Sequence, residues 1–376
     1  MPESLEPLKI NIEQESEPTD IFADRASLKE AIKEAVEKGF RFVHVALRTG
    51  EGKTHAALRL KPKELQAKKL VFLRPSPHRL PDEFLPKGWH RLFGRSHPGY
   101  VRDPDGTYRE AEEGEKPDIP PNCSFAPLLR IAVQHGYRAK DFCQVCPVRR
   151  QCKRSGYLAQ RVQAHRKRKV LQSLWQVDGS VKDATVVIDE PSQMGLFCDA
   201  SFGFEEIAQA VGALIFADIA SERMTRLREG LLRLKEAVEK RKVLNRSEIA
   251  SFFELEDLQA IAAQPNDPQK RQRTARAIME QWMQYKTANI APLWLKTFAE
   301  ILTGQVDGDV WVEEGSLNLR WRDSRWTFIK GSARTVVLLE ANKSTEQLCE
   351  ELGLERKEVC RVAGEPEKLP KNLSQV

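Results

Sequence analysis

Apolar and polar residues follow two different spacings along the chain, and these spacings predict where strands and helices lie. Short runs of consecutive apolar residues, bounded by glycine, proline or charged residues, are typical of buried strands. Four runs fit this description: Phe40–Leu47, Leu70–Leu73, Ala184–Ile188 and Thr335–Leu339. Helical spacing dominates from Phe204 to Leu302. Strands followed by helices predict an α/β core with a largely parallel sheet.

Three other segments have recognisable local patterns. Residues 27–39 predict a helix in which Ser27 is the cap, Glu30 completes a capping box and Gly39 ends the helix. Residues 310–329 alternate, which predicts short antiparallel strands. Residues 1–20 are acidic and polar and predict a disordered leader that is neither a signal peptide nor a basic transit sequence.

Composition sets the broad class. The chain has 376 residues, enough for two or three domains, and 41% of them are hydrophobic and 30% charged, as expected of a folded, soluble protein. The longest apolar runs are far shorter than the roughly 20 residues that span a bilayer. We therefore expect a cytoplasmic protein with no membrane partner.

A glycine-rich segment, Leu47–Thr54 (LRTGEGKT), follows a predicted strand and opens a predicted helix, which is the context of a phosphate-binding loop. Glycines let backbone amides surround phosphate oxygens at the start of a helix. We expect Lys53 to neutralise the β- and γ-phosphates and the Thr54 hydroxyl to bind Mg²⁺. The alternative is a glycine turn that only starts a helix. The predicted nucleotide-binding residues are Thr49, Gly50, Glu51, Gly52, Lys53 and Thr54.

An acidic pair follows the strand at Val186–Ile188. A phosphate-binding loop needs such a partner at the end of a neighbouring strand. We expect Asp189 to hold Mg²⁺ through water and Glu190 to polarise the attacking water as a general base. With Lys53, these are the predicted catalytic residues. The alternative is a solvated turn.

Four of the seven cysteines fall within 30 residues, in the pattern C-x19-C-x2-C-x5-C: Cys123, Cys143, Cys146 and Cys152. This clustering suggests a metal rather than disulfides. Four thiolates can bind a tetrahedral Zn²⁺ or one [4Fe–4S] cluster, and spacing alone does not separate the two. Buried free cysteines are a third interpretation.

Basic residues are concentrated just after the cysteines. The net charge of +6 is modest, but Arg149–Lys169 contains nine Lys or Arg residues and no Asp or Glu. A solvated helix face usually mixes both signs, so this run is a candidate contact for a polyanion. The alternative is a helix whose long side chains reach into water. The candidate contacts are Arg149, Arg150, Arg166, Lys167, Arg168 and Lys169.

Several of these motifs resemble those of superfamily 2 helicases. TGEGKT and DEPS resemble motifs I and II, although Leu47 replaces a small residue and Ser192 replaces a terminal His or Asp. The four cysteines lie between these motifs, as in the XPD/DinG-like iron–sulfur helicases, and KRSGYLAQR resembles the stretch after the last cluster cysteine. Residues 72–76, ending in Ser76, resemble motif Ia, which contacts the DNA backbone, and Glu340-Ala341-Asn342 weakly resembles motif III.

The resemblance implies a RecA-like P-loop core with a four-cysteine cluster insert and a helical arch-like insert. It implies ATP, Mg²⁺ and a [4Fe–4S] cluster as cofactors, with Zn²⁺ as the alternative, and single-stranded DNA as the partner of the basic run and Ser76. The expected boundaries are a leader (1–20), motor segments (21–98, 176–203 and 304–360), the cysteine insert (99–175), the arch-like insert (204–303) and a tail (361–376).

The expected function is therefore that of a single-stranded-DNA-dependent ATPase or helicase. Complete helicases of this type have a second RecA-like domain whose arginines complete the ATP site, and no QxxGRxxR-like stretch occurs here. We expect that domain to come from another chain or to be lost by truncation. The first rival is a non-catalytic nucleic-acid-binding module with a relic ATP site and a structural zinc. The second is a P-loop switch protein with a zinc ribbon.

Overall fold

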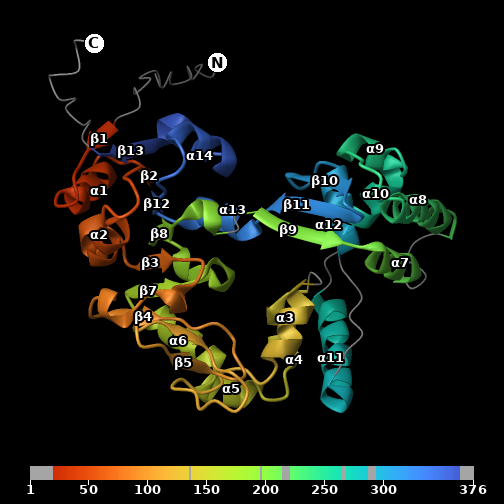
Figure 1. Cartoon of the computed structure of the whole chain (residues 1–376), viewed down its shortest axis with the longest axis horizontal. Coiled ribbons are helices and arrows are strands. Elements are labelled where there is room, and N and C mark those ends of the chain that lie inside the picture. Colours follow the sequence, from red (N-terminus) through yellow and green to blue (C-terminus); the bar gives the residue numbers. More distant parts are fainter. Residues whose placement is uncertain are drawn as a thin grey trace, which may run out of the picture. The chain divides into compact units, whose positions relative to one another are not determined.

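The computed structural model describes residues 20–134, 137–194, 197–213, 221–263, 268–286 and 294–364 (Figure 1). The predicted leader lies outside these residues except for its last position, Asp20. The chain divides into two compact units. The first comprises the residues up to Leu73, Val181–Ser192 and the residues from Ser332 onward, and the second comprises Arg74–Ser180 and Gln193–Gly331. The second unit thus consists of two insertions into the first.

Six strands of a parallel sheet form the centre of the first unit. In spatial order they are β1 (Asp20–Phe22), β13 (Val359–Ala363), β2 (Phe42–Val45), β12 (Thr335–Leu339), β8 (Thr185–Asp189) and β3 (Leu70–Leu73). All residues of β2, β12, β8 and β3 are buried. Continuous apolar runs of this kind are typical of parallel strands packed on both faces. The four predicted strands are therefore confirmed, and Leu70–Leu73 and Thr335–Leu339 coincide with β3 and β12.

Three α-helices accompany these strands: α1 (Leu28–Glu37), α2 (Lys53–Arg59) and α14 (Thr345–Leu352). The predicted helix after Ser27 is present, but the predicted capping box is wrong. The side chain of Ser27 caps no helix amide and instead donates to Asp24 Oδ1 at 2.6 Å. A capping box is found at α14, where Ser344 Oγ accepts from the Gln347 backbone N–H at 3.1 Å.

The second unit begins with short elements around the cysteine segment. β4 (Trp89–Arg91) and β7 (Lys169–Gln172) are paired in parallel, and β5 (Tyr100–Arg102) and β6 (Tyr108–Glu110) are antiparallel. The helices here are α3 (Ala126–Gln134), α4 (Ala139–Val145), α5 (Arg149–Ser155) and α6 (Tyr157–Arg166). The short 3₁₀ turns are η2 (Pro77–Arg79), η3 (Asp82–Phe84) and η4 (Leu174–Gln176).

The rest of the second unit is largely helical, as predicted. Its helices are α7 (Phe204–Ala213), α8 (Ser221–Glu239), α9 (Arg246–Ala250), α10 (Leu255–Ala262), α11 (Pro268–Tyr285) and α12 (Trp294–Leu302). All but α11 gather around an antiparallel sheet with the order β10 (Gly308–Glu313), β11 (Ser316–Arg322) and β9 (Phe197–Phe202) (Figure 1). Trp294 stacks on Phe202 in this core with ring centroids 5.0 Å apart. Among the described residues, no helix is both long and apolar enough to cross a membrane.

The predicted strands at residues 310–329 are confirmed only as far as Arg322. The following residues form α13 (Ser324–Ser332), because the buried carboxylate of Asp323 accepts a hydrogen bond from the Arg325 backbone N–H at 2.7 Å and so favours a helix start. Trp326 and Ile329 are fully buried and lie three residues apart, on one helix face. The alternation read from the sequence was therefore wrong for this segment.

Helix α11 packs against α3 and α4, the helices that border the cysteines (Figure 1). Ala275, Ile278 and Met279 of α11 bury their side chains in this cluster. Arg271 Nε also donates to the buried Asp141 Oδ2 at 3.1 Å. A helix of the predicted arch-like insert thus completes the core around the cysteine segment.

Candidate nucleotide site and cysteine cavity

The glycine-rich loop connects β2 to α2 through left-handed backbone. Gly50 has φ +88° and Gly52, the residue before α2, has φ +83°. Residues with a side chain rarely adopt these angles, so the sequence needs glycine at both positions. Ala56 N–H already donates to Gly52 O at 2.9 Å, which starts the helix at Lys53. The first amides of α2 therefore face the loop, as phosphate binding at a helix N-terminus requires.

Lys53 and Thr54 have their polar atoms at the ends of the central strands. Lys53 Nζ donates to Leu47 O at 2.6 Å and to Arg48 O at 3.0 Å, so the ammonium group lies over the loop. Burial lowers the pKa of Lys53, and the negative charge of Asp189 opposes this effect. Thr54 Oγ1 donates to Asp189 Oδ1 at 3.0 Å. The structure therefore brings the glycine-rich loop and the acidic pair together.

The acidic pair has two different environments. Asp189 ends β8 and is buried, whereas the side chain of Glu190 is exposed. Glu190 has φ +54°, and its N–H donates to Leu339 O at 3.1 Å. A non-glycine residue in this region costs about 1 kcal/mol or more, and such strain occurs preferentially at functional sites. The Glu190 carboxylate thus projects beyond the strand end while Asp189 stays against Thr54.

A third carboxylate at these strand ends belongs to Glu340, which follows β12. Its Oε2 accepts a hydrogen bond from the Ser192 hydroxyl and one from the Ser192 N–H at 3.3 Å. Its Oε1 accepts from the N–H groups of Ala341 and Asn342, both at 3.0 Å. Sequence reasoning treated Glu340 only as a weak motif III match. The available sequence signal was its position directly after the buried strand Thr335–Leu339, and only the structure shows that this strand lies between β2 and β8.

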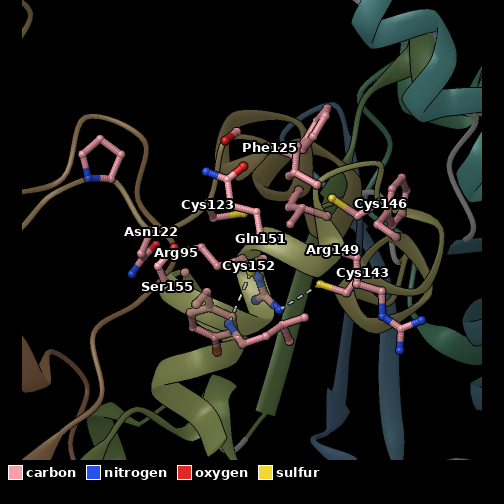
Figure 2. A pocket seen from close by; sticks show the side chains of 18 of the residues that line it. Arg95, Asn122, Cys123, Phe125, Cys143, Cys146, Arg149, Gln151, Cys152 and Ser155 are labelled. Carbon is pink, nitrogen blue, oxygen red and sulfur yellow. Dashed lines mark hydrogen bonds between the residues drawn. The ribbon is translucent and has the colours of Figure 1, made fainter.

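The four clustered cysteines line one cavity of about 100 Å³ in the second unit. Cys123 precedes α3, Cys143 lies in α4, Cys146 directly follows α4, and Cys152 lies in α5. Figure 2 shows their side chains around this space, together with those of Phe125 and Arg95. The four cysteines, which span 30 residues of sequence, therefore line the same cavity in the folded chain.

Buried polar contacts hold this cavity in shape. Asn122 Oδ1 accepts a hydrogen bond from Ser96 N–H at 2.9 Å, and the backbone carbonyl of Asn122 accepts one from Tyr157 N–H at 2.8 Å. Gly156 lies so close to this frame that a Cβ atom would stand 2.9 Å from Asn122 O and from Cys152 Cα. Asn122, the neighbour of Cys123 in the chain, and Gly156, whose N–H donates to Cys152 O at 3.0 Å, thus hold the segments of these two cysteines together.

Electrostatics differ among the four thiols. Burial raises the pKa of Cys123 to about 11 and also raises that of Cys146. Arg95 Nη2 donates to Cys143 Sγ at 3.7 Å (Figure 2). The Arg95 guanidinium also lies 4.1 Å from the centroid of the Tyr157 ring. Cys152 Sγ accepts from Leu158 N–H at 3.4 Å. Burial thus disfavours the free thiolate at Cys123 and Cys146, whereas Cys143 and Cys152 each accept a hydrogen bond from an N–H donor.

The arrangement differs from that of a single-ion site. In the part of the chain that the structure describes, no three His, Cys, Asp or Glu side chains are close enough together to hold one metal ion. A zinc ion with Zn–S bonds of about 2.3 Å would need sulfurs only about 4 Å apart. The four cysteines share one cavity but do not form a closed single-ion site as their side chains stand.

The predicted nucleic-acid contacts lie on several elements. Arg150 on α5 is exposed, whereas Arg149 is half-buried against the cysteine cavity and donates to Gln144 O at 3.3 Å. Residues 166–168 are exposed at the end of α6 and the turn that follows it, and Lys169 begins β7 with its ammonium 5.4 Å from the centroid of the Trp89 ring. Ser76 is half-exposed just before η2.

Comparisons with known proteins bear on the fold. No family model and no curated protein matched the sequence. Among solved structures, a chain titled "XPD_Helicase" is 13% identical, and the match covers 90% of this chain and 61% of that chain with a TM-score of 0.50. This chain has an XPD-like helicase fold. The RecA-like α/β core expected from the sequence is thereby confirmed.

Two further structures are similar to this XPD-like chain. One titled "Truncated XPD" is 12% identical over 90% of this chain and 99% of that one, with a TM-score of 0.46. Xpd4 of S. tokodaii is 13% identical over 90% of this chain and 60% of that one, with a TM-score of 0.38. The chain spans about 61% of the length of the first matched helicase, and its fold is that of a helicase-like domain.

Proposed function

We propose that this chain is the first motor domain of a single-stranded-DNA-dependent ATPase of the iron–sulfur superfamily 2 helicase type. The observation that carries the proposal is the hydrogen bond of 3.0 Å between Thr54 and Asp189. It joins the glycine-rich loop after β2 to the acidic pair after β8, at the carboxyl ends of parallel strands, where α/β sheets bind their ligands.

The residues at this site suit Mg²⁺-bound ATP. A hydroxyl and a carboxylate within 3.0 Å of each other are oxygen ligands of the kind Mg²⁺ takes, directly or through water. The loop amides and Lys53 would hold the phosphates, with Lys53 exchanging its present carbonyl partners for phosphate oxygens. The exposed Glu190 carboxylate would accept the proton of the attacking water. Bound Mg²⁺ would neutralise the charge that develops on the phosphates.

The cysteine cavity supports a [4Fe–4S] cluster as the second cofactor. Cys123, Cys143, Cys146 and Cys152 would supply the four thiolates that such a cluster needs. When bound, the cluster would cross-link the segment before α3 to α4 and α5. The exposed basic residues of the run Arg149–Lys169, namely Arg150 and residues 166–168, would contact DNA phosphates.

The proposal is tested by replacing Lys53 with alanine. Loss of the ammonium group removes the main positive charge for the β- and γ-phosphates, so we expect ATP binding to fall below detection in isothermal titration calorimetry with MgATP. Turnover of ATP stimulated by single-stranded DNA should be lost together with binding.

A matched control is Lys357→Ala, which removes an exposed lysine that forms a surface ion pair with Glu355. This variant should bind ATP as the wild type does. Equal ATP affinity of Lys53→Ala and the wild type would remove the motor assignment. Binding of ATP without DNA-stimulated turnover, even with a second motor domain added, would instead favour a nucleic-acid-binding module with a relic site.

A further inference from the structure

Trp175 is displayed on the surface by a rigid turn. Its side chain is 58% exposed, whereas its neighbours Leu174 and Gln176 are only 1% and 4% exposed. Gln176 Oε1 accepts from Ser173 N–H at 2.9 Å, and Gln176 Nε2 donates to Phe93 O at 2.9 Å. The residues on both sides are therefore fixed in the core. The indole has no such anchor in the interior, and the turn directs it outward.

One face of this indole is backed by a fixed cation. The Arg325 guanidinium lies 3.8 Å from the Trp175 ring centroid. Arg325 is itself held by the buried Asp323, which accepts its Nε at 2.8 Å and also its Nη2. An arginine fixed by a two-point carboxylate contact loses little additional freedom when it stacks on a ring. The pair thus forms a preorganised flat surface.

The Trp175–Arg325 pair lies near the carboxyl end of a parallel strand, β7, which is where ligands of such sheets bind. Trp175 lies three residues beyond Gln172, the last residue of β7. Arg74 N–H donates to Gln172 O at 3.1 Å, so the segment leading to Ser76, the proposed contact for the DNA backbone, lies beside this strand end. Ligands of such sheets bind at the carboxyl ends of strands.

The segment that follows Trp175 is held by helix α6. Asp178, three residues further on, accepts hydrogen bonds from Arg161 and, at 2.9 Å, from His165 Nε2, both on α6. Helix α6 carries part of the basic run and leads into the exposed residues 166–168. The turn that displays Trp175 is thereby attached to the helix that would attract a nucleic-acid backbone.

We infer that Trp175, backed by Arg325, is a stacking platform for one base of single-stranded DNA. The inference rests on the proposed function and adds a residue that stacks on a base instead of contacting a phosphate. Exposed aromatic rings beside a basic track bind single strands in this way, and each stacked base contributes about 1–3 kcal/mol. Such stacking gives affinity with little sequence preference.

The test compares two probes on the full-length protein: an oligothymidylate of about 12 nucleotides, within the usual range of site sizes, and an abasic strand of the same length and charge. Trp175→Ala should weaken binding of the oligothymidylate by roughly 5- to 150-fold, measured by fluorescence anisotropy. It should leave the affinity for the abasic strand unchanged. Trp175→Phe should retain most of the affinity, because it keeps a flat ring.

Two controls separate this inference from the proposed function. Phe22→Ala removes an exposed aromatic side chain of β1 and should change neither affinity. Replacing residues 166–168 with alanine should weaken both probes equally and reduce the salt dependence of binding. Unchanged oligothymidylate binding by Trp175→Ala, or an equal loss for both probes, would overturn the platform while DNA binding stands. A wild-type protein that binds neither probe would overturn the DNA-binding proposal and the platform together.

Discussion

Glu340 ties the ends of two central strands, β8 and β12, together. It is 2% exposed and accepts hydrogen bonds from Ser192 after β8 and from Ala341 and Asn342 after β12. Burial raises the pKa of Glu340, but these hydrogen bonds lower it by more, so its pKa lies below the ordinary value of 4.5. The stabilisation from the charged form is present above the unfolded-state pKa and is lost as the pH falls through the folded-state pKa.

Glu340→Gln should therefore destabilise the protein in a pH-dependent way. An amide group in place of the carboxylate turns one acceptor into a donor facing Ser192, which we expect to lower the free energy of unfolding by about 1–3 kcal/mol near neutral pH. The difference in free energy of unfolding between this variant and the wild type should become smaller once the pH falls below 4.5. Urea unfolding curves at several pH values measure this. A constant difference across the series, or the same behaviour in the exposed-site control Glu355→Gln, would contradict it.

Among the secondary-structure elements, those with a continuous local signal were predictable from the sequence. β3 and β12 are uninterrupted apolar runs, so their bounds followed directly. α13 was missed because Trp326 and Phe328 continue the alternating pattern of the preceding strand. The buried pair, Trp326 and Ile329, has helical spacing, which becomes apparent only when Asp323 is recognised as the helix start. Local patterns decide elements only where no single polar contact changes the outcome.

Contacts between elements that are distant in the sequence were harder to predict. The sequence placed four cysteines close together, but not the packing of α11 against α3 and α4, because the Arg271–Asp141 contact spans 130 residues of chain. The Ser192–Glu340 contact spans 148 residues and depends on β8 and β12 being neighbours. Residue types can suggest a site, whereas strand order decides which of these residues meet.

The cysteine cavity yields a prediction about α4 and α5. If a cluster links Cys123, Cys143, Cys146 and Cys152, its removal should loosen α4 and α5 relative to each other, because these two helices contact each other much less than they contact α11 and α6. Protein purified without oxygen should contain iron and absorb near 400 nm, and chelation after oxidation should speed amide hydrogen exchange in α4 and α5. The β8 and β12 peptides of the first unit should not change. Zinc in place of iron, or exchange that is equal with and without metal, would contradict the assignment.

For the molecule as a whole, the two candidate sites belong to different units. The nucleotide site draws only on residues of the first unit, and the cysteine cavity only on residues of the second. ATP binding and cofactor binding should therefore be separable by mutation. The chain also spans about 61% of the matched XPD helicase chain. We propose that a second RecA-like domain supplies the arginines that complete the ATP site.

A complementation experiment tests whether a second RecA-like domain supplies these arginines. Alone, the chain should hydrolyse ATP slowly even with saturating single-stranded DNA, because arginines contributed across such a site raise the rate by about 10³- to 10⁵-fold. Adding the second motor domain of an XPD-type helicase should increase the rate toward that range, provided that the added domain docks at the strand ends near Lys53. The increase should disappear when the added domain has its arginines replaced by alanine, or when this chain carries Lys53→Ala. Rapid turnover by the chain alone, unaffected by the added domain, would show that its own residues already complete the site.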